Sequence, residues 1–145
     1  MFETRNDLPL ATRTQAVRLL NARLADAIDL GTQTKHAHWN VRGPNFIALH
    51  ELFDQLAEHT EEHIDTIAAA ARATSLKPYP ENLSEGVAHV RALATARAAF
   101  GAGVRAAIDA ADTFGDKDSA DLFTGMSRAV DKDLWFLEAH LHAKR

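Results

Sequence analysis

Apolar residues recur along most of the chain at the three- and four-residue spacing of amphipathic helices, in four stretches. In the first stretch, one helical face begins apolar and ends on a histidine. Its members are Val17, Leu20, Leu24, Ala27, Gly31, Thr34 and His38. We therefore predict that the His38 side chain points to the same side as the apolar core.

The breaks in this pattern predict where the helices begin and end. The turn VRGPN ends the first helix, because Pro44 cannot continue a helix and restricts the preceding Gly43. The second helix is predicted from about 45 to 74, before the two prolines of LKPYPENL. The third begins near Ser84, read as an N-cap, and ends at FGDKD; the fourth begins near Ser119. Short connections predict antiparallel neighbours.

The later three stretches also carry apolar positions that we expect in the core. They are Ile47, Leu49, Phe53, Leu56, Ile64 and Ile67 in the second, Val87, Val90, Ala94, Gly101, Val104 and Ile108 in the third, and Leu122, Met126, Val130, Leu134, Leu137 and Leu141 in the fourth. With 145 residues, 46% of them hydrophobic, the chain is long enough for one sizeable core. The pattern predicts a single all-α domain over residues 1–145, folded as a four-helix bundle.

Composition excludes several classes of function. The chain has no cysteine, so disulfides, zinc ribbons, iron–sulfur clusters and thiol catalysis are excluded, and a bound metal must have nitrogen and oxygen ligands. A net charge of -4 does not predict a surface that attracts nucleic acid as a whole, so DNA binding would need a local basic patch. Without a signal sequence or a long apolar run, we expect a soluble cytoplasmic protein with no membrane partner.

His50 and Asp54 are the first candidate metal ligands, because residues four apart share a helix face. The alternative is a solvated hydrogen-bonded pair. Asp65 lies on the same face three turns later, about 16 Å along the axis, so one ion cannot bind all three side chains of one chain. If two copies of this helix crossed antiparallel about a two-fold axis near His59, His50 and Asp54 would lie opposite the Asp65 side chain of the second copy. The spacing thus suggests an intersubunit metal site.

A metal centre inside the bundle is not expected. Di-iron bundles bury Glu-x-x-His motifs, and none of the eight histidines has a glutamate three residues before it. Carboxylate and histidine chemistry, if present, is therefore predicted at a subunit interface.

Three segments carry a family resemblance: TKHAHWNVRGPNFIALHELFDQL, EHIDTIA and DKDLWFLEAHL. They resemble the Dps family, the ferritin-like DNA-binding proteins from starved cells, and the resemblance covers nearly the whole chain. It implies a hollow homo-dodecamer that oxidises Fe(II), preferentially with hydrogen peroxide, stores the ferric mineral and, in many members, binds DNA. The implied iron ligands and ferroxidase residues are His38, His50 and Asp54 of one subunit and Asp65 of its two-fold mate.

The chain departs from the family pattern after Asp65. The family has a glutamate four residues later, where this chain has Ala69, and roughly a dozen or more residues are missing before SLKPYP. Three explanations of the missing segment remain open: a natural variant, an engineered deletion and an omission from the sequence. We expect weakened but not abolished iron oxidation. Glu58 and Glu61 share the face and are less favoured substitutes. The alternative is a non-catalytic structural or DNA-compacting protein; a third reading is a monomeric or dimeric helical binding module.

The resemblance extends to further surface residues. The connection between the third and fourth helices is similar to the family's three-fold pore region, or is a solvated acidic loop; its acidic residues are Asp109, Asp112, Asp116 and Asp118. Arg105 and Asp121 resemble an interface ion pair. Trp39 is expected to pack at its helix end rather than to intercept oxidant, and Trp135 to lie in the core or an interface.

Direct DNA binding stays open. Few basic residues occur near the termini, namely Arg5, Arg13, Lys144 and Arg145, with His140 and His142 cationic only at lower pH. If DNA is bound, the protein is expected at the nucleoid.

Overall fold

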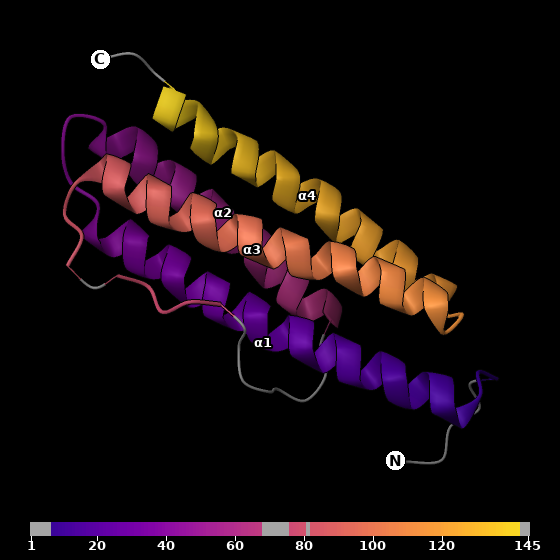
Figure 1. Cartoon of the computed structure of the whole chain (residues 1–145). Coiled ribbons are helices and arrows are strands. Elements are labelled where there is room, and N and C mark those ends of the chain that lie inside the picture. The colour runs from indigo at the N-terminus through magenta and orange to yellow at the C-terminus, as the bar shows by residue number, and fades with distance from the viewer. Residues whose placement is uncertain (1–6, 68–75, 81, 143–145) are drawn as a thin grey trace.

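Four long helices make up most of the described chain (Figure 1). The computed structural model describes residues 7–67, 76–80 and 82–142. In order, the helices are α1 (Leu10–Asn40), α2 (Phe46–Ile67), α3 (Gly86–Thr113) and α4 (Lys117–His142). α1 packs along α2, α3 packs along α4, and α1 also contacts α3. The predicted all-α four-helix bundle is confirmed. No helix in the described ranges is long and apolar enough to cross a bilayer.

The turn between α1 and α2 lies where the sequence predicts it. α1 ends at Asn40, and Val41 already has an extended backbone. Gly43 has a φ of 110°, a left-handed conformation that side chains disfavour, and this requires glycine at that position. α2 begins at Phe46, as predicted, whereas its predicted end at residue 74 lies outside the described residues.

The predicted N-cap of α3 is wrong by one residue. Glu85, not Ser84, occupies the cap position, and its side chain makes no capping hydrogen bond. The chain is held here by backbone contacts instead: Gly86 N–H donates to the carbonyl oxygen of Arg42 over 3.1 Å. This bond ties the start of α3 to the turn that follows α1.

The predicted start of α4 at Ser119 is also corrected. α4 begins at Lys117, and the preceding Asp116 supplies the cap. Its carboxylate accepts hydrogen bonds from the Ser119 backbone N–H at 3.0 Å and from the Ser119 hydroxyl at 2.8 Å. Ser119 is thus the third residue of the helix, where an N-cap carboxylate normally binds.

Two apolar clusters fill the bundle, one toward each end. One contains Leu24, Leu30, Phe100, Val104, Phe123 and Val130, and the other contains Val41, Leu49, Phe53, Leu56, Val90, Leu93 and Leu137. Most predicted core positions are buried or partly buried. Val17, Ile47 and Val87 are the exceptions, 41%, 63% and 44% exposed, because they lie at the edge of each apolar face, beyond the neighbouring helices of this chain.

A buried polar layer separates the two clusters. The Arg97 side chain is fully buried and pairs with the Asp133 carboxylate. Its second terminal nitrogen donates to the Leu56 carbonyl oxygen at 2.8 Å and to the Thr60 hydroxyl at 3.2 Å, and His59 Nδ1 lies 2.9 Å from Asp133. Burial lowers the pKa of Arg97 to about 10, so the guanidinium stays charged at neutral pH. The layer ties α2, α3 and α4 together at mid-length.

Gly86 offers a test of packing at the start of α3. A Cβ added there would lie 2.6 Å from Leu49 Cδ1 and 3.3 Å from the Arg42 carbonyl oxygen. We expect Gly86→Ala to lower the free energy of unfolding by about 1–3 kcal/mol. The matched control is Gly125→Ala in α4, where a Cβ meets nothing within 4 Å; it should stabilise by about 0.5–1 kcal/mol. Urea unfolding measures both, and equal effects would contradict the close packing at Gly86.

Candidate metal centre

The turn between α1 and α2 brings His38 and His50 into contact. Their rings stack with centroids 3.7 Å apart. The Nδ1 atom of each ring lies 3.1 Å from the backbone carbonyl oxygen of the other residue. A carbonyl oxygen only accepts, so each Nδ1 carries the hydrogen, and the neutral form of each ring has its lone pair on Nε2. The two imidazoles are therefore oriented with one metal-binding nitrogen each.

Asp54 is the third candidate ligand that the single chain places beside His38 and His50. It lies one turn after His50 on α2, and its Oδ1 is 3.8 Å from His38 Nδ1. The same oxygen is 2.5 Å from Lys35 Nζ. The hydrogen bond from Lys35 holds the pKa of Asp54 below its usual value, against an opposing effect of desolvation. Asp54 is thus an anionic carboxylate whose charge is balanced by Lys35.

Lys35 is the residue of this site that the sequence analysis missed. It precedes His38 by three residues, so both lie on the same face of α1. That spacing is the signal that could have placed a cation near Asp54, since His38 was already assigned to the site.

Asp65 is not brought to the other three residues within one chain. It is exposed on α2, three turns beyond Asp54 and about 16 Å away along the helix axis. Within the described part of the single chain, no group of three or more His, Asp or Glu side chains is placed to hold a metal ion. Ala69 lies outside the described residues.

An acidic face of α2 links Asp54 to Asp65. Glu58, Glu61 and Asp65 are exposed along it, and the Asp54 side chain is 46% exposed. His59, beside this face, instead contacts Asp133 of its own chain. In the single chain, this face of α2 is therefore exposed and accessible to another molecule.

The acidic connection before α4 has mixed roles. Asp116 is buried as the cap of α4, so its predicted place among pore-lining carboxylates is wrong. Asp112 pairs with Lys117, while Asp109 and Asp118 are exposed. These three residues stay consistent with either a pore or a solvated loop.

Arg105 also has a different partner within the chain. It pairs with Asp131 of α4 at 2.9 Å, and both side chains are about half exposed. Asp121 is exposed. A pairing of Arg105 with Asp121 across an interface stays a prediction.

Both tryptophans lie on the surface of the single chain. Trp39 is 72% exposed and Trp135 is 63% exposed. The prediction that Trp39 packs at its helix end is therefore wrong within this chain, and Trp135 does not lie in the core. An interface role for Trp135 stays a prediction.

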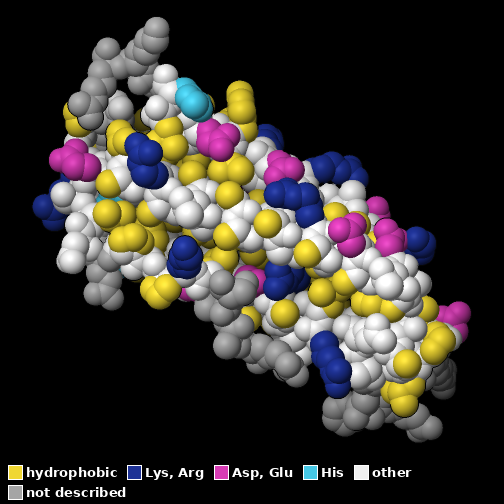
Figure 2. Space-filling model, viewed as in Figure 1, with side chains coloured by type: hydrophobic (Ala, Val, Ile, Leu, Met, Phe, Trp, Pro, Cys, Tyr) yellow, Lys and Arg dark blue, Asp and Glu magenta, His cyan; other side chains and the backbone are white. Residues whose placement is uncertain are grey.

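Charge on the visible face does not gather into a basic patch. Figure 2 shows Lys and Arg side chains interspersed with Asp and Glu on that face. Arg5, Lys144 and Arg145 lie outside the described residues.

Comparison with known proteins identifies the fold family and several relatives of this chain. The family described as a ferritin-like domain matches residues 17–145, which makes this a ferritin-like bundle. The DNA protection during starvation protein of Agrobacterium fabrum is 41% identical, over 98% of this chain and 97% of that protein. The solved structure of DpsC from Streptomyces coelicolor superposes with a TM-score of 0.92 at 26% identity, covering 99% of this chain and 93% of that one. Dps from Microbacterium arborescens in the high iron form gives 0.83 at 32% identity, covering 92% and 96%.

This chain belongs to the Dps family, whose general roles are iron storage and DNA protection. The alignment with the Agrobacterium fabrum protein spans 157 positions, more than the 145 residues of this chain, so at least 12 residues of that relative have no counterpart here. The difference agrees in size with the segment that the resemblance places before SLKPYP.

Proposed function

We propose that this chain is a cytoplasmic subunit of a hollow dodecamer that oxidises Fe(II), with hydrogen peroxide as preferred oxidant, and stores ferric iron. The ligands are His38, His50 and Asp54, together with Asp65 of the partner subunit across a two-fold axis. The observation that carries the proposal is the stacked pair of His38 and His50, with Asp54 3.8 Å from the His38 ring, on the accessible face of α2. Membership in the Dps family supports the same chemistry.

The donor set suits iron as a substrate. Imidazole and carboxylate ligands accept both ferrous and ferric ions, and a site with few protein ligands leaves coordination positions for an oxidant. Two ferrous ions give one electron each to one hydrogen peroxide molecule, which takes up two protons and forms two water molecules. This route consumes peroxide without releasing hydroxyl radical, and it protects DNA without requiring contact with DNA.

Lys35 competes with iron for Asp54 in this proposal. Replacing it removes both the hydrogen bond to Asp54 and a positive charge close to the ion. We expect Lys35→Gln to raise the affinity for Fe(II) about two- to fivefold, the scale of an exposed ion pair. Anaerobic Fe(II) titration measures the effect. Lys117→Gln, which breaks the exposed pair with Asp112, is the matched control and should leave the affinity unchanged. A weaker affinity in Lys35→Gln would show that Lys35 supports iron binding.

Ala69→Glu tests the missing ligand. It restores a carboxylate four residues after Asp65 in the sequence, and we expect peroxide-dependent iron oxidation to rise about tenfold or more, the scale on which metal-site groups act. Stopped-flow absorbance of ferric iron measures the initial rate. No gain would favour the alternative function, a structural or DNA-compacting protein with a disabled site.

Assembly and storage are tested together by native mass spectrometry. The protein receives Fe(II) anaerobically and then a pulse of peroxide. We expect a particle near twelve times 15.9 kDa that gains and retains iron after the pulse. A small assembly, or a dodecamer that stays free of iron, would overturn the proposal.

A further inference from the structure

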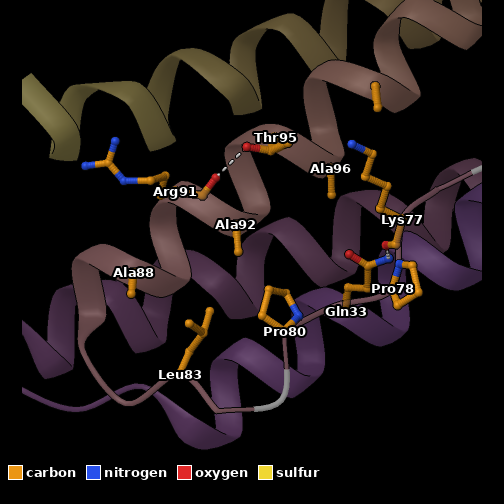
Figure 3. Close-up of a pocket in the computed structure, with 11 residues that line it drawn as sticks. Gln33, Lys77, Pro78, Pro80, Leu83, Ala88, Arg91, Ala92, Thr95 and Ala96 are labelled. Carbon is orange, nitrogen blue, oxygen red and sulfur yellow. Dashed lines mark hydrogen bonds between the residues drawn. The ribbon is translucent and has the colours of Figure 1, made fainter.

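A pocket of about 660 Å³ lies between α1, α3 and the segment 76–80 (Figure 3). Its volume falls within the roughly 300–1,000 Å³ typical of small-molecule sites. The wall is mainly apolar and includes Pro78, Pro80, Leu83, Ala88, Ala92 and Ala96. The pocket and the proposed iron site have no residue in common.

Specific contacts hold the segment 76–80 in place. The Tyr79 hydroxyl lies 2.6 Å from Nδ1 of His89, which is fully buried on α3. Burial lowers the pKa of His89 and raises that of Tyr79, so the neutral imidazole accepts the hydroxyl hydrogen. Two residues before Tyr79, the Lys77 carbonyl oxygen accepts a hydrogen bond from Gln33 Nε2 at 3.2 Å. Anchors on both α1 and α3 thus fix the wall that contains Pro78 and Pro80.

The polar groups of the pocket are cationic or neutral. Lys77 and Arg91 line it, and its lining includes no Asp or Glu among the described residues. Lys77 leaves the segment on the side of Ala96 (Figure 3), and its ammonium forms no ion pair with any described residue. The guanidinium of Arg91 extends to the opposite end of the view. The pocket therefore combines an apolar wall with an available positive charge at one end.

Gln33 adds a polar side chain at the same end. The residue is only 4% exposed. Its nitrogen donates to the Lys77 carbonyl and, at 3.3 Å, to Asp29. In Figure 3 its carboxamide oxygen points away from Lys77 toward the side of Pro80 and Ala92. This oxygen offers a hydrogen-bond acceptor to a ligand group or a bound water molecule beside Lys77.

We infer that this pocket binds a free amphipathic carboxylic acid, an aliphatic chain that ends in a carboxylate. The Lys77 ammonium binds the carboxylate through a charge-assisted hydrogen bond. The aliphatic chain lies against the alanines of α3 and the two prolines, where it is removed from water. Complementarity of charge selects an anionic head group, and the bounded volume suits a whole small molecule better than one chain of a membrane lipid.

Calorimetric titration of the assembled, iron-free protein with decanoate, decanol and decylamine tests the inference. We expect decanoate to bind about tenfold more tightly than decanol, because of the charge-assisted bond, and decylamine to bind most weakly. Lys77→Met should weaken decanoate about tenfold and leave decanol unchanged. Lys132→Met is the matched control, because Lys132 is exposed on α4 and does not line the pocket, and it should change the affinity by less than about twofold. Ala92→Phe should abolish binding of both by filling the pocket, with circular dichroism confirming that the helices remain.

Four results would overturn the inference. Equal affinities for the three probes would remove the role of charge, and unchanged binding by Ala92→Phe would place the ligand elsewhere. Absence of binding, together with hydrogen-exchange protection of α3 that depends on assembly, would show that a second copy covers the pocket. Binding to vesicles of anionic phospholipid without binding of decanoate would assign the pocket to a membrane surface.

Discussion

Asp133→Ala is expected to lower the free energy of unfolding by about 3–5 kcal/mol. The substitution leaves the Arg97 guanidinium fully buried with no counter-charge, and it also removes the acceptor of His59. The Leu56 and Thr60 oxygens still accept hydrogen bonds from Arg97, but neither carries a charge. Urea unfolding followed by circular dichroism measures the loss.

Asp131→Ala is the matched control for this experiment. Asp131 lies two residues earlier on the same helix and forms an exposed pair with Arg105, so its loss should cost no more than about 1 kcal/mol. The double variant Arg97→Met with Asp133→Leu should recover most of the stability, because it removes both buried charges. A cost for Asp133→Ala no larger than for Asp131→Ala would show that Arg97 finds another partner.

The second large effect is expected at the proposed shared iron site. His50→Ala and Asp65→Ala should each lower the initial rate of iron oxidation by about 10- to 100-fold or more, because each removes a ligand. When the two variants are co-assembled in equal amounts, half of the two-fold interfaces pair unlike chains. One site of each such interface has lost both ligands and the other is intact. We therefore expect about a quarter of the wild-type rate, measured by stopped-flow absorbance.

A second mixture provides the control. Co-assembly of His50→Ala with His38→Ala should restore nothing, because both residues come from the same chain at every site. If the His50→Ala and Asp65→Ala mixture is no faster than its components, the site is not shared between subunits. Recovery in both mixtures would show that the His38 and His50 ligands of one site come from different subunits.

Helix periodicity predicts most of this fold because burial in a bundle repeats with the helical turn. Leu24, Phe53, Val104 and Val130 are found in the core for that reason. Periodicity does not show how far a neighbouring helix reaches, so Val17 and its counterparts in α2 and α3 lie exposed at the edges of apolar faces. Apolar character alone could not distinguish these two environments.

Local hydrogen bonding explains the errors at the helix starts. Ser and Asp are both good N-caps, and FGDKDSAD offers several of them within one turn. The choice of Asp116 over Ser119 depends on which side chain reaches the free N–H groups, and this is a property of the folded backbone.

The candidate site was predicted in part. The spacing of His50 and Asp54 follows from helix geometry, whereas His38 entered by family resemblance, and its stacking on His50 depends on the path of the turn at Gly43. Long-range charge pairing was missed altogether: Arg97 and Asp133 are 36 residues apart, and each alone reads as a surface residue. Sequence periodicity carries no signal for such pairs.

The exposure of both tryptophans has a spectroscopic consequence. Since Trp39 and Trp135 are the two tryptophans of the chain and are both largely solvated after folding, their emission maximum should shift little when a single chain folds. Covering either indole in an assembly would replace water by protein and move the emission to shorter wavelength. Intrinsic fluorescence therefore measures the association of this protein, whereas circular dichroism measures the formation of its helices. Together the two signals distinguish subunit folding from shell formation in one sample.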